Sequence, residues 1–135
     1  MTARRRQADS TAMATHAALL KKLRAIIEAL PETSEKLSHG APTWWGGRKT
    51  FATFHDGHYD EGRPSVWIKA AEGAQEALVE SDPETFFRPK YVGPSGWVGV
   101  RLTGGTNWDE VGALLVDGYR LVAPKRALKQ LDEAK

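Results

Sequence analysis

An amphipathic helix near the start of the chain constrains its fold more than any other feature. From about Thr15 to Leu30, apolar residues recur at intervals of three and four positions, which places them on one helical face. They are Leu19, Leu20, Leu23, Ile26, Ile27 and Leu30. Pro31 follows directly and cannot continue the helix. This apolar stripe must pack against a second layer that the rest of the chain supplies.

Strand patterns follow the helix. We predict strands over Thr43–Trp45, Thr50–His55 and Ser65–Lys69, because β-branched, aromatic and alternating residues are concentrated there. The first two flank Gly46-Gly47-Arg48-Lys49, which is typical of a hairpin turn and has a basic tip. Residues 32–42 are expected to form a connecting loop with room for one helical turn.

The second half of the chain alternates between helix and strand patterns. Trp97–Leu102 is the clearest strand, because Val98, Val100 and Leu102 share one face and Trp97, Gly99 and Arg101 share the other. Helices are predicted over Glu72–Ser81, from the capping residue Asn107 onward, and over Ala127–Ala134. The short connections between strands favour an α+β fold of two layers, an antiparallel sheet with helices on one face.

Length and composition indicate one folded domain. We expect a disordered N-terminal extension over residues 1–12 and a single domain over residues 13–135, with Met13 as an alternative start to Met1. The chain has no cysteine, which excludes disulfides, thiolate metal ligands and a cysteine nucleophile. No apolar run approaches the roughly 20 residues that span a bilayer, so we expect a cytoplasmic protein.

The charge distribution gives limited support to a nucleic-acid partner. The sequence pI is about 9.0 and the net charge is +2. Residues 1–10 carry three arginines against Asp9, so the other 125 residues hold equal numbers of basic and acidic side chains. Duplex-DNA binders usually have a basic excess, because phosphate neutralisation supplies much of their affinity.

Several short motifs occur together in a recognisable order. They are His39-Gly40-Ala41-Pro42, Lys49-Thr50-Phe51-Ala52, Val66-Trp67-Ile68-Lys69, Asp82-Pro83-Glu84-Thr85-Phe86-Phe87, Tyr91-Val92-Gly93, Gly96-Trp97-Val98-Gly99-Val100-Arg101-Leu102, Trp108 and Tyr119-Arg120-Leu121-Val122-Ala123. In this order and spacing the chain resembles the MmcQ/YjbR family over roughly Leu19 to Leu128. The resemblance implies an antiparallel two-layer fold similar to the secretion-chaperone or frataxin-like (CyaY-like) arrangement. It also implies a DNA-binding protein of double-wing shape, and it brings no catalytic residues.

Two carboxylate-free segments supply the candidate DNA contacts. Residues 36–55 and 85–108 contain basic and aromatic side chains but no Asp or Glu. Basic groups bind phosphates and aromatic rings stack on bases. The candidate nucleic-acid-binding residues are therefore Arg48, Lys49, Arg88, Lys90, Tyr91, Trp97 and Arg101. A basic hairpin tip and tryptophans in a small domain also fit a solvated turn and an ordinary core.

Another class of function stays open beside DNA binding. In a protein- or small-ligand-binding domain, Trp44, Trp67 and Trp97 would line an apolar surface or pocket. His55-x-x-His58-x-Asp60-Glu61 contains metal-ligand types, but a polar hairpin loop is the better interpretation. We predict no enzyme, no catalytic residues, no cofactor and no metal site. The sequence leaves the protein partner open and predicts a monomer or weak homodimer.

Overall fold

The computed structural model describes residues 16–58 and 60–134. The extension predicted over residues 1–12 lies outside the described residues. Residues 16–28 are helical, and the helix pattern ends before Pro31 as the sequence predicts. The later helices are α2 (Ala74–Ser81), the short 3-10 helix η1 (Gly93–Ser95), α3 (Trp108–Val122) and α4 (Lys125–Glu133).

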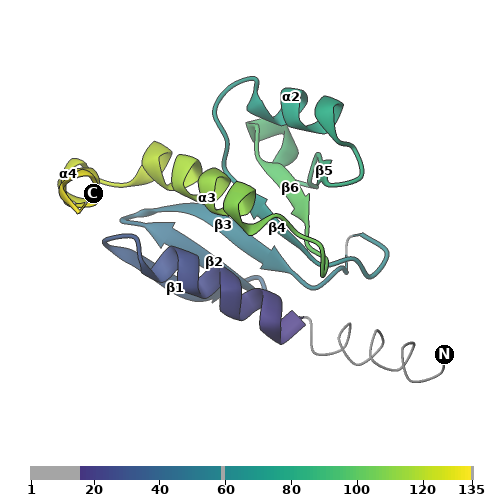
Figure 1. Cartoon of the computed structure of the whole chain (residues 1–135), viewed down its shortest axis with the longest axis horizontal. Coiled ribbons are helices and arrows are strands. Elements are labelled where there is room, and N and C mark those ends of the chain that lie inside the picture. The colour runs from purple at the N-terminus through teal and green to yellow at the C-terminus, as the bar shows by residue number, and fades with distance from the viewer. Residues whose placement is uncertain (1–15, 59, 135) are drawn as a thin grey trace.

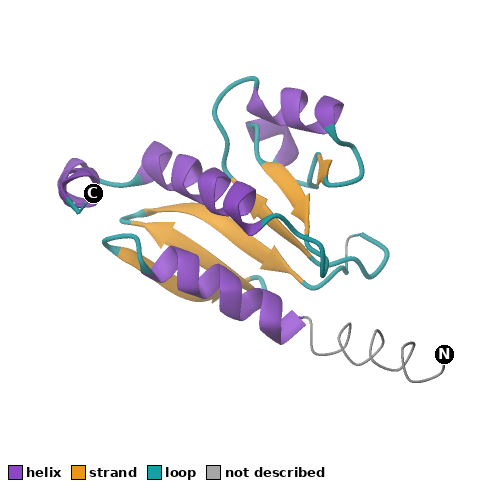
Figure 2. Cartoon of the chain, viewed as in Figure 1, coloured by secondary structure: helices purple, strands orange, loops and turns teal. Residues whose placement is uncertain are grey.

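The strands of the described chain form one antiparallel sheet. They are β1 (Thr33–Ser38), β2 (Ala41–Gly46), β3 (Lys49–His55), β4 (Ser65–Ile68), β5 (Phe86–Phe87) and β6 (Val98–Arg101). Their order across the sheet is β1-β2-β3-β4-β6-β5, and every neighbouring pair is antiparallel. The helix of residues 16–28 and α3 lie across the same face of this sheet (Figure 1). The predicted α+β class with an antiparallel sheet is thus confirmed, and Figure 2 shows the two kinds of element in their layers.

The prediction of a connecting loop over residues 32–42 is wrong. These residues form β1 and the start of β2, paired from Thr33 with Gly46 to Ser38 with Ala41. β1 is an edge strand with mostly exposed side chains, so its sequence lacks the apolar alternation that marks a half-buried strand. Long-range contacts help to hold it. The Glu35 carboxylate accepts hydrogen bonds from Arg24 at 2.9 and 2.7 Å and from the Trp44 indole at 3.0 Å.

The core lies between the helices and one face of the sheet. Leu23 and Ile27 from the N-terminal helix and Leu115 from α3 are fully buried there. Gly118 allows α3 to approach the sheet closely, because a Cβ at this position would lie 2.7 Å from the Lys69 carbonyl oxygen. The Asn107 side chain accepts hydrogen bonds from the backbone N–H groups of two residues in the first turn of α3, which confirms the predicted helix start.

The register places a second row of side chains on the opposite face of the sheet. Thr53 pairs with Trp67, Trp67 with Gly99, and Gly99 with Phe87. A Cβ at Gly99 would lie 2.3 Å from Phe87 Cζ, so only glycine leaves room for the Phe87 ring. Trp67 is only 4% exposed, although the N-terminal helix and α3 lie on the other face (Figure 1). Trp67 also lines a pocket at one end of the sheet.

Candidate functional site

A pocket of about 770 Å³ lies where the β1–β2 turn meets the end of β3. Its walls come from the N-terminal helix, the β1–β2 turn, β3 and the loop after it, β4, and the loop after β5. The lining residues are Leu20, Ser38, His39, Gly40, Ala41, Pro42, Phe54, His55, Asp56, His58, Trp67, Tyr91 and Val92. A volume of this size suits a small organic ligand, since ligand pockets commonly measure roughly 300–1,000 Å³.

Trp67 and His55 form a stacked pair in the pocket wall. Their ring centroids are 3.7 Å apart and their planes differ by 27°. Both rings are fixed further, because Thr53 Oγ1 lies 3.1 Å from His55 Nε2 and the Trp67 indole donates to Ser65 Oγ at 3.0 Å. Burial lowers the pKa of His55, although the nearby Asp56 charge opposes this shift. The pair is therefore a rigid wall, with His55 neutral near neutral pH.

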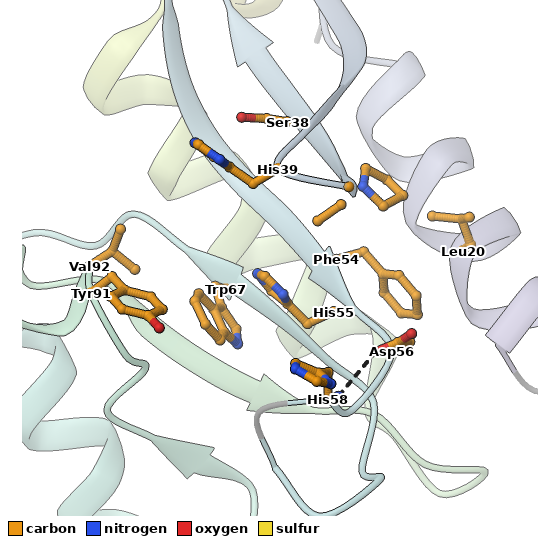
Figure 3. Close-up of a pocket in the computed structure, with 13 residues that line it drawn as sticks. Leu20, Ser38, His39, Phe54, His55, Asp56, His58, Trp67, Tyr91 and Val92 are labelled. Carbon is orange, nitrogen blue, oxygen red and sulfur yellow. Dashed lines mark hydrogen bonds between the residues drawn. The ribbon is translucent and has the colours of Figure 1, made fainter.

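The rim carries two residues with unusual backbone geometry. His39 has a φ of 52° and Tyr91 a φ of 66°, both in the left-handed region that non-glycine residues rarely adopt. Tyr91 is 76% exposed although it is a large aromatic residue. In Figure 3, Trp67 lies between Tyr91 and His55, with His39 above and His58 below. Strained backbone and an exposed ring are typical of positions shaped for a ligand rather than for stability.

Arg101, one of the candidate DNA contacts, is held by groups of the protein itself. Its Nε lies 2.8 Å from Asp60 Oδ2, and its guanidinium lies 4.7 Å from the centre of the Phe87 ring. Its NH1 group donates to the carbonyls of Pro83 and Glu84 at 3.0 and 3.1 Å. With only 16% of the side chain exposed, the guanidinium is largely committed to closing the β3–β4 loop onto β6.

Asp60 is the acceptor at the centre of this contact. It also receives a hydrogen bond of 2.7 Å from Arg63. Burial alone raises the pKa of Asp60, but hydrogen bonds and charges from Arg101 and Arg63 outweigh it and lower the pKa below its ordinary value. Among the described residues, no group of three or more His, Asp or Glu side chains is placed to hold a metal ion.

The other candidate DNA contacts on the second basic segment differ in exposure. Trp97 is buried, with 7% of its surface exposed, so its ring has no open face for a base. The Arg88 side chain packs over Gly93, where an added Cβ would meet Arg88 Cγ at 2.8 Å. Lys90 is exposed and precedes Tyr91, which lines the pocket, but Lys90 itself does not line it. Of the candidate DNA contacts, Tyr91 is therefore the one that lines the pocket.

Arg48 and Lys49 lie at the opposite end of β3. β3 runs from Lys49 to His55, which separates the hairpin tip from the pocket by about 20 Å. Both side chains are exposed, and within the described part of the chain neither makes an ion pair. A Cβ at Gly47 would lie 2.9 Å from Pro124, so the tip adjoins the start of α4 and the exposed residues Lys125 and Arg126. We call Arg48, Lys49, Lys125 and Arg126 the basic corner.

The tryptophans proposed for an apolar surface also have different locations. Trp44 is in the core and Trp97 is buried outside the pocket, whereas Trp67 lines it. The sequence alone does not indicate that His39, His55, His58 and Tyr91 share one cavity, nor that Lys125 and Arg126 adjoin the hairpin tip. These groups come from segments far apart in the chain. The glycine of His39-Gly40 is the local sequence signal for the turn at the pocket rim, because glycine favours tight turns.

These features define a class: an α+β domain with a six-stranded antiparallel sheet and an open pocket at one end of it. The YjbR family model matches residues 28–121, which is more than half of the chain. The chain therefore belongs to the YjbR family, as its sequence motifs predict.

A solved structure shares the fold. The crystal structure of the Deinococcus radiodurans protein DR2400, which has a DUF419 domain, matches with a TM-score of 0.67 and 20% sequence identity. The match covers 84% of this chain and 87% of that one. The comparison with curated proteins found no match. Within residues 16–58 and 60–134, no helix has the length and apolar character needed to cross a membrane.

Proposed function

We propose that this protein is a non-catalytic binding module that takes a small, planar aromatic ligand into the pocket beside Trp67. The pocket of about 770 Å³ carries the proposal, because it combines room for a ligand with a rigid wall formed by Trp67 and His55. Tyr91 supplies an exposed ring at the rim that a second flat ring can stack against.

N-phenyl-1-naphthylamine is a suitable probe, because it is uncharged and its fluorescence rises in apolar surroundings. We expect saturable binding to the full chain. Nitrogen-15 NMR spectra should show shifts for the Trp67 indole and for the backbone of His39 and Tyr91. Tyr91→Asn removes the ring, and asparagine tolerates a positive φ. This variant should bind the probe about two- to tenfold more weakly, the effect of one aromatic contact.

The matched control is the double variant Arg48→Ala/Lys49→Ala, which changes the surface at the far end of β3. It should bind the probe as the unmodified chain does. Equal affinity of the Tyr91→Asn variant and the unmodified chain, or shifts that avoid the pocket residues, would show that the pocket is not the binding site.

The basic corner supports a second function, DNA binding, which the YjbR resemblance also implies. The basic corner comprises four exposed cations on two adjoining segments, and Glu32 pairs with one of them, Arg126, at 2.6 Å. The remaining charges of Arg48, Lys49 and Lys125 are exposed together and suit the phosphates of a duplex. This surface differs from the basic-aromatic sheet face predicted from the sequence, because Arg101 and Trp97 are not part of it.

Fluorescence anisotropy with labelled duplex DNA over a salt series tests this second function. Arg48→Ala/Lys49→Ala should weaken binding and reduce the slope of log affinity against log salt by about 2, one unit per lost phosphate contact. Lys21→Ala/Lys22→Ala removes the same charge from the N-terminal helix and should leave the slope nearly unchanged. Equal effects of the two double variants would indicate non-specific attraction and would remove the basic corner from the model.

A further inference from the structure

The polar lining of the pocket is rich in imidazole groups. His39 comes from the β1–β2 turn, His55 from the end of β3 and His58 from the loop that follows. One carboxylate, Asp56, also lines the pocket, and its Oδ1 accepts a hydrogen bond of 3.0 Å from the His58 backbone N–H. Tyr91 completes the titratable groups of the described lining. The side chains here can therefore donate more hydrogen bonds to a ligand than a purely apolar pocket could.

The three imidazoles differ in burial. The His55 ring is buried in the stack with Trp67 and shares a hydrogen bond with Thr53, so it belongs to the wall. His39 and His58 are exposed at the rim, where a polar group of a ligand can reach them while it stays in contact with water. An imidazolium at the rim can donate to a ligand oxygen while the ligand ring remains inside.

We infer that the pocket prefers a planar aromatic anion, whose carboxylate, sulfonate or phosphate group is held at the rim by one of two imidazoles, that of His39 or that of His58 (Figure 3). This inference rests on the proposed ligand-binding function. It specifies the ligand class, since an aromatic ring suits Trp67 and Tyr91 and an acidic group suits an imidazole at the rim. The Asp56 carboxylate opposes an anion, which makes the preference depend on protonation of the histidines.

Two probes that differ by one charge test the inference. 8-Anilinonaphthalene-1-sulfonate has the same three rings as N-phenyl-1-naphthylamine and adds a sulfonate. The ratio of their dissociation constants is measured at about pH 8 and at about pH 6, on either side of the ordinary imidazole pKa of about 6.5. We expect the preference for the sulfonate to rise by about three- to tenfold at the lower pH, the effect of a charge-assisted hydrogen bond reduced by solvent exposure.

The variant His39→Asn/His58→Asn identifies the groups responsible. Asparagine accepts the positive φ of position 39 and carries no charge at either pH. In this variant the ratio of the two dissociation constants should no longer change with pH. Circular dichroism at both pH values confirms that the chains are folded, because 8-anilinonaphthalene-1-sulfonate also binds partly unfolded proteins.

The outcomes separate the inference from the function on which it rests. If the neutral probe binds at Tyr91 but the ratio is independent of pH, or changes equally in the histidine variant, the inference is overturned and the ligand pocket stands. If the neutral probe does not bind, the proposed function and the inference both fail. Sulfonate binding that persists unchanged in Tyr91→Asn comes from surface cations and also overturns the inference.

Discussion

Replacing Asp60 with Asn should destabilise the protein more than most substitutions in a loop do. The carboxylate joins the β3–β4 loop to Arg101 on β6 at 2.8 Å and to Arg63 at 2.7 Å. Asparagine keeps the shape of the side chain and removes its charge. The Arg101 side chain, which is only 16% exposed, would then carry its charge without an anionic partner.

The expected loss follows from the burial of this pair. Hydrogen bonds to charged groups contribute roughly 1.5–3 kcal/mol, whereas fully exposed ion pairs contribute about 0.2–1 kcal/mol. Asp60 is 13% exposed, so the contact lies nearer the first case. We expect a loss of about 2 kcal/mol in the free energy of unfolding, which corresponds to about 1 M in the urea midpoint. Asp132→Asn is the matched control, because Asp132 is 58% exposed in its pair with Arg120, and it should cost less than about 0.5 kcal/mol.

The loss should also depend on pH in a defined direction. Because the pKa of Asp60 is lowered in the folded protein, its stabilisation is fully present above the unfolded pKa of about 3.9. The stabilisation disappears as pH falls through the lower folded pKa. Urea unfolding at about pH 7 and about pH 3 should therefore show a difference between the unmodified chain and Asp60→Asn that shrinks in acid. A cost no larger than that of Asp132→Asn, or one unchanged by acid, would refute this reasoning.

Three further substitutions test the packing around the candidate sites, each by urea unfolding. Gly99→Ala should cost about 1–3 kcal/mol because the new Cβ overlaps the Phe87 ring, and Phe87→Leu in the same chain should recover part of the loss. Gln75→Ala removes two hydrogen bonds to backbone carbonyls at Gly93 and Trp97 and should cost about 1–3 kcal/mol. Hydrogen exchange of residues 88–97 should then increase, and unchanged exchange would contradict this role. Asn107→Ala removes the cap of α3 and should cost about 1 kcal/mol, whereas an unchanged midpoint would mean the cap contributes little.

Periodic burial explains what the sequence could predict about the fold. The N-terminal helix and α3 each bury one face, so their apolar residues recur at helical spacing. β4 and β6 are buried on both faces and were identified by their alternating and β-branched residues. The hairpin tip and the Asn107 cap are short-range features that follow from a few adjacent residues. The short connections between strands and the family motifs both predicted the α+β class and the antiparallel sheet. β1 was not predicted, because an exposed edge strand has no buried face and therefore no alternation of apolar and polar residues in its sequence.

The sequence by itself thus determined the helices, most strands and the family of this protein, whereas the tertiary structure decided which side chains meet. Arg101 has the same charge as Arg48 in the sequence, but only the fold places Asp60 beside one and open solvent around the other. In the same way, sheet register and loop closure bring His39 and Tyr91 to one rim. Local patterns record how far each residue is buried, while a binding site depends on contacts between distant segments, which form only when the whole sheet is assembled.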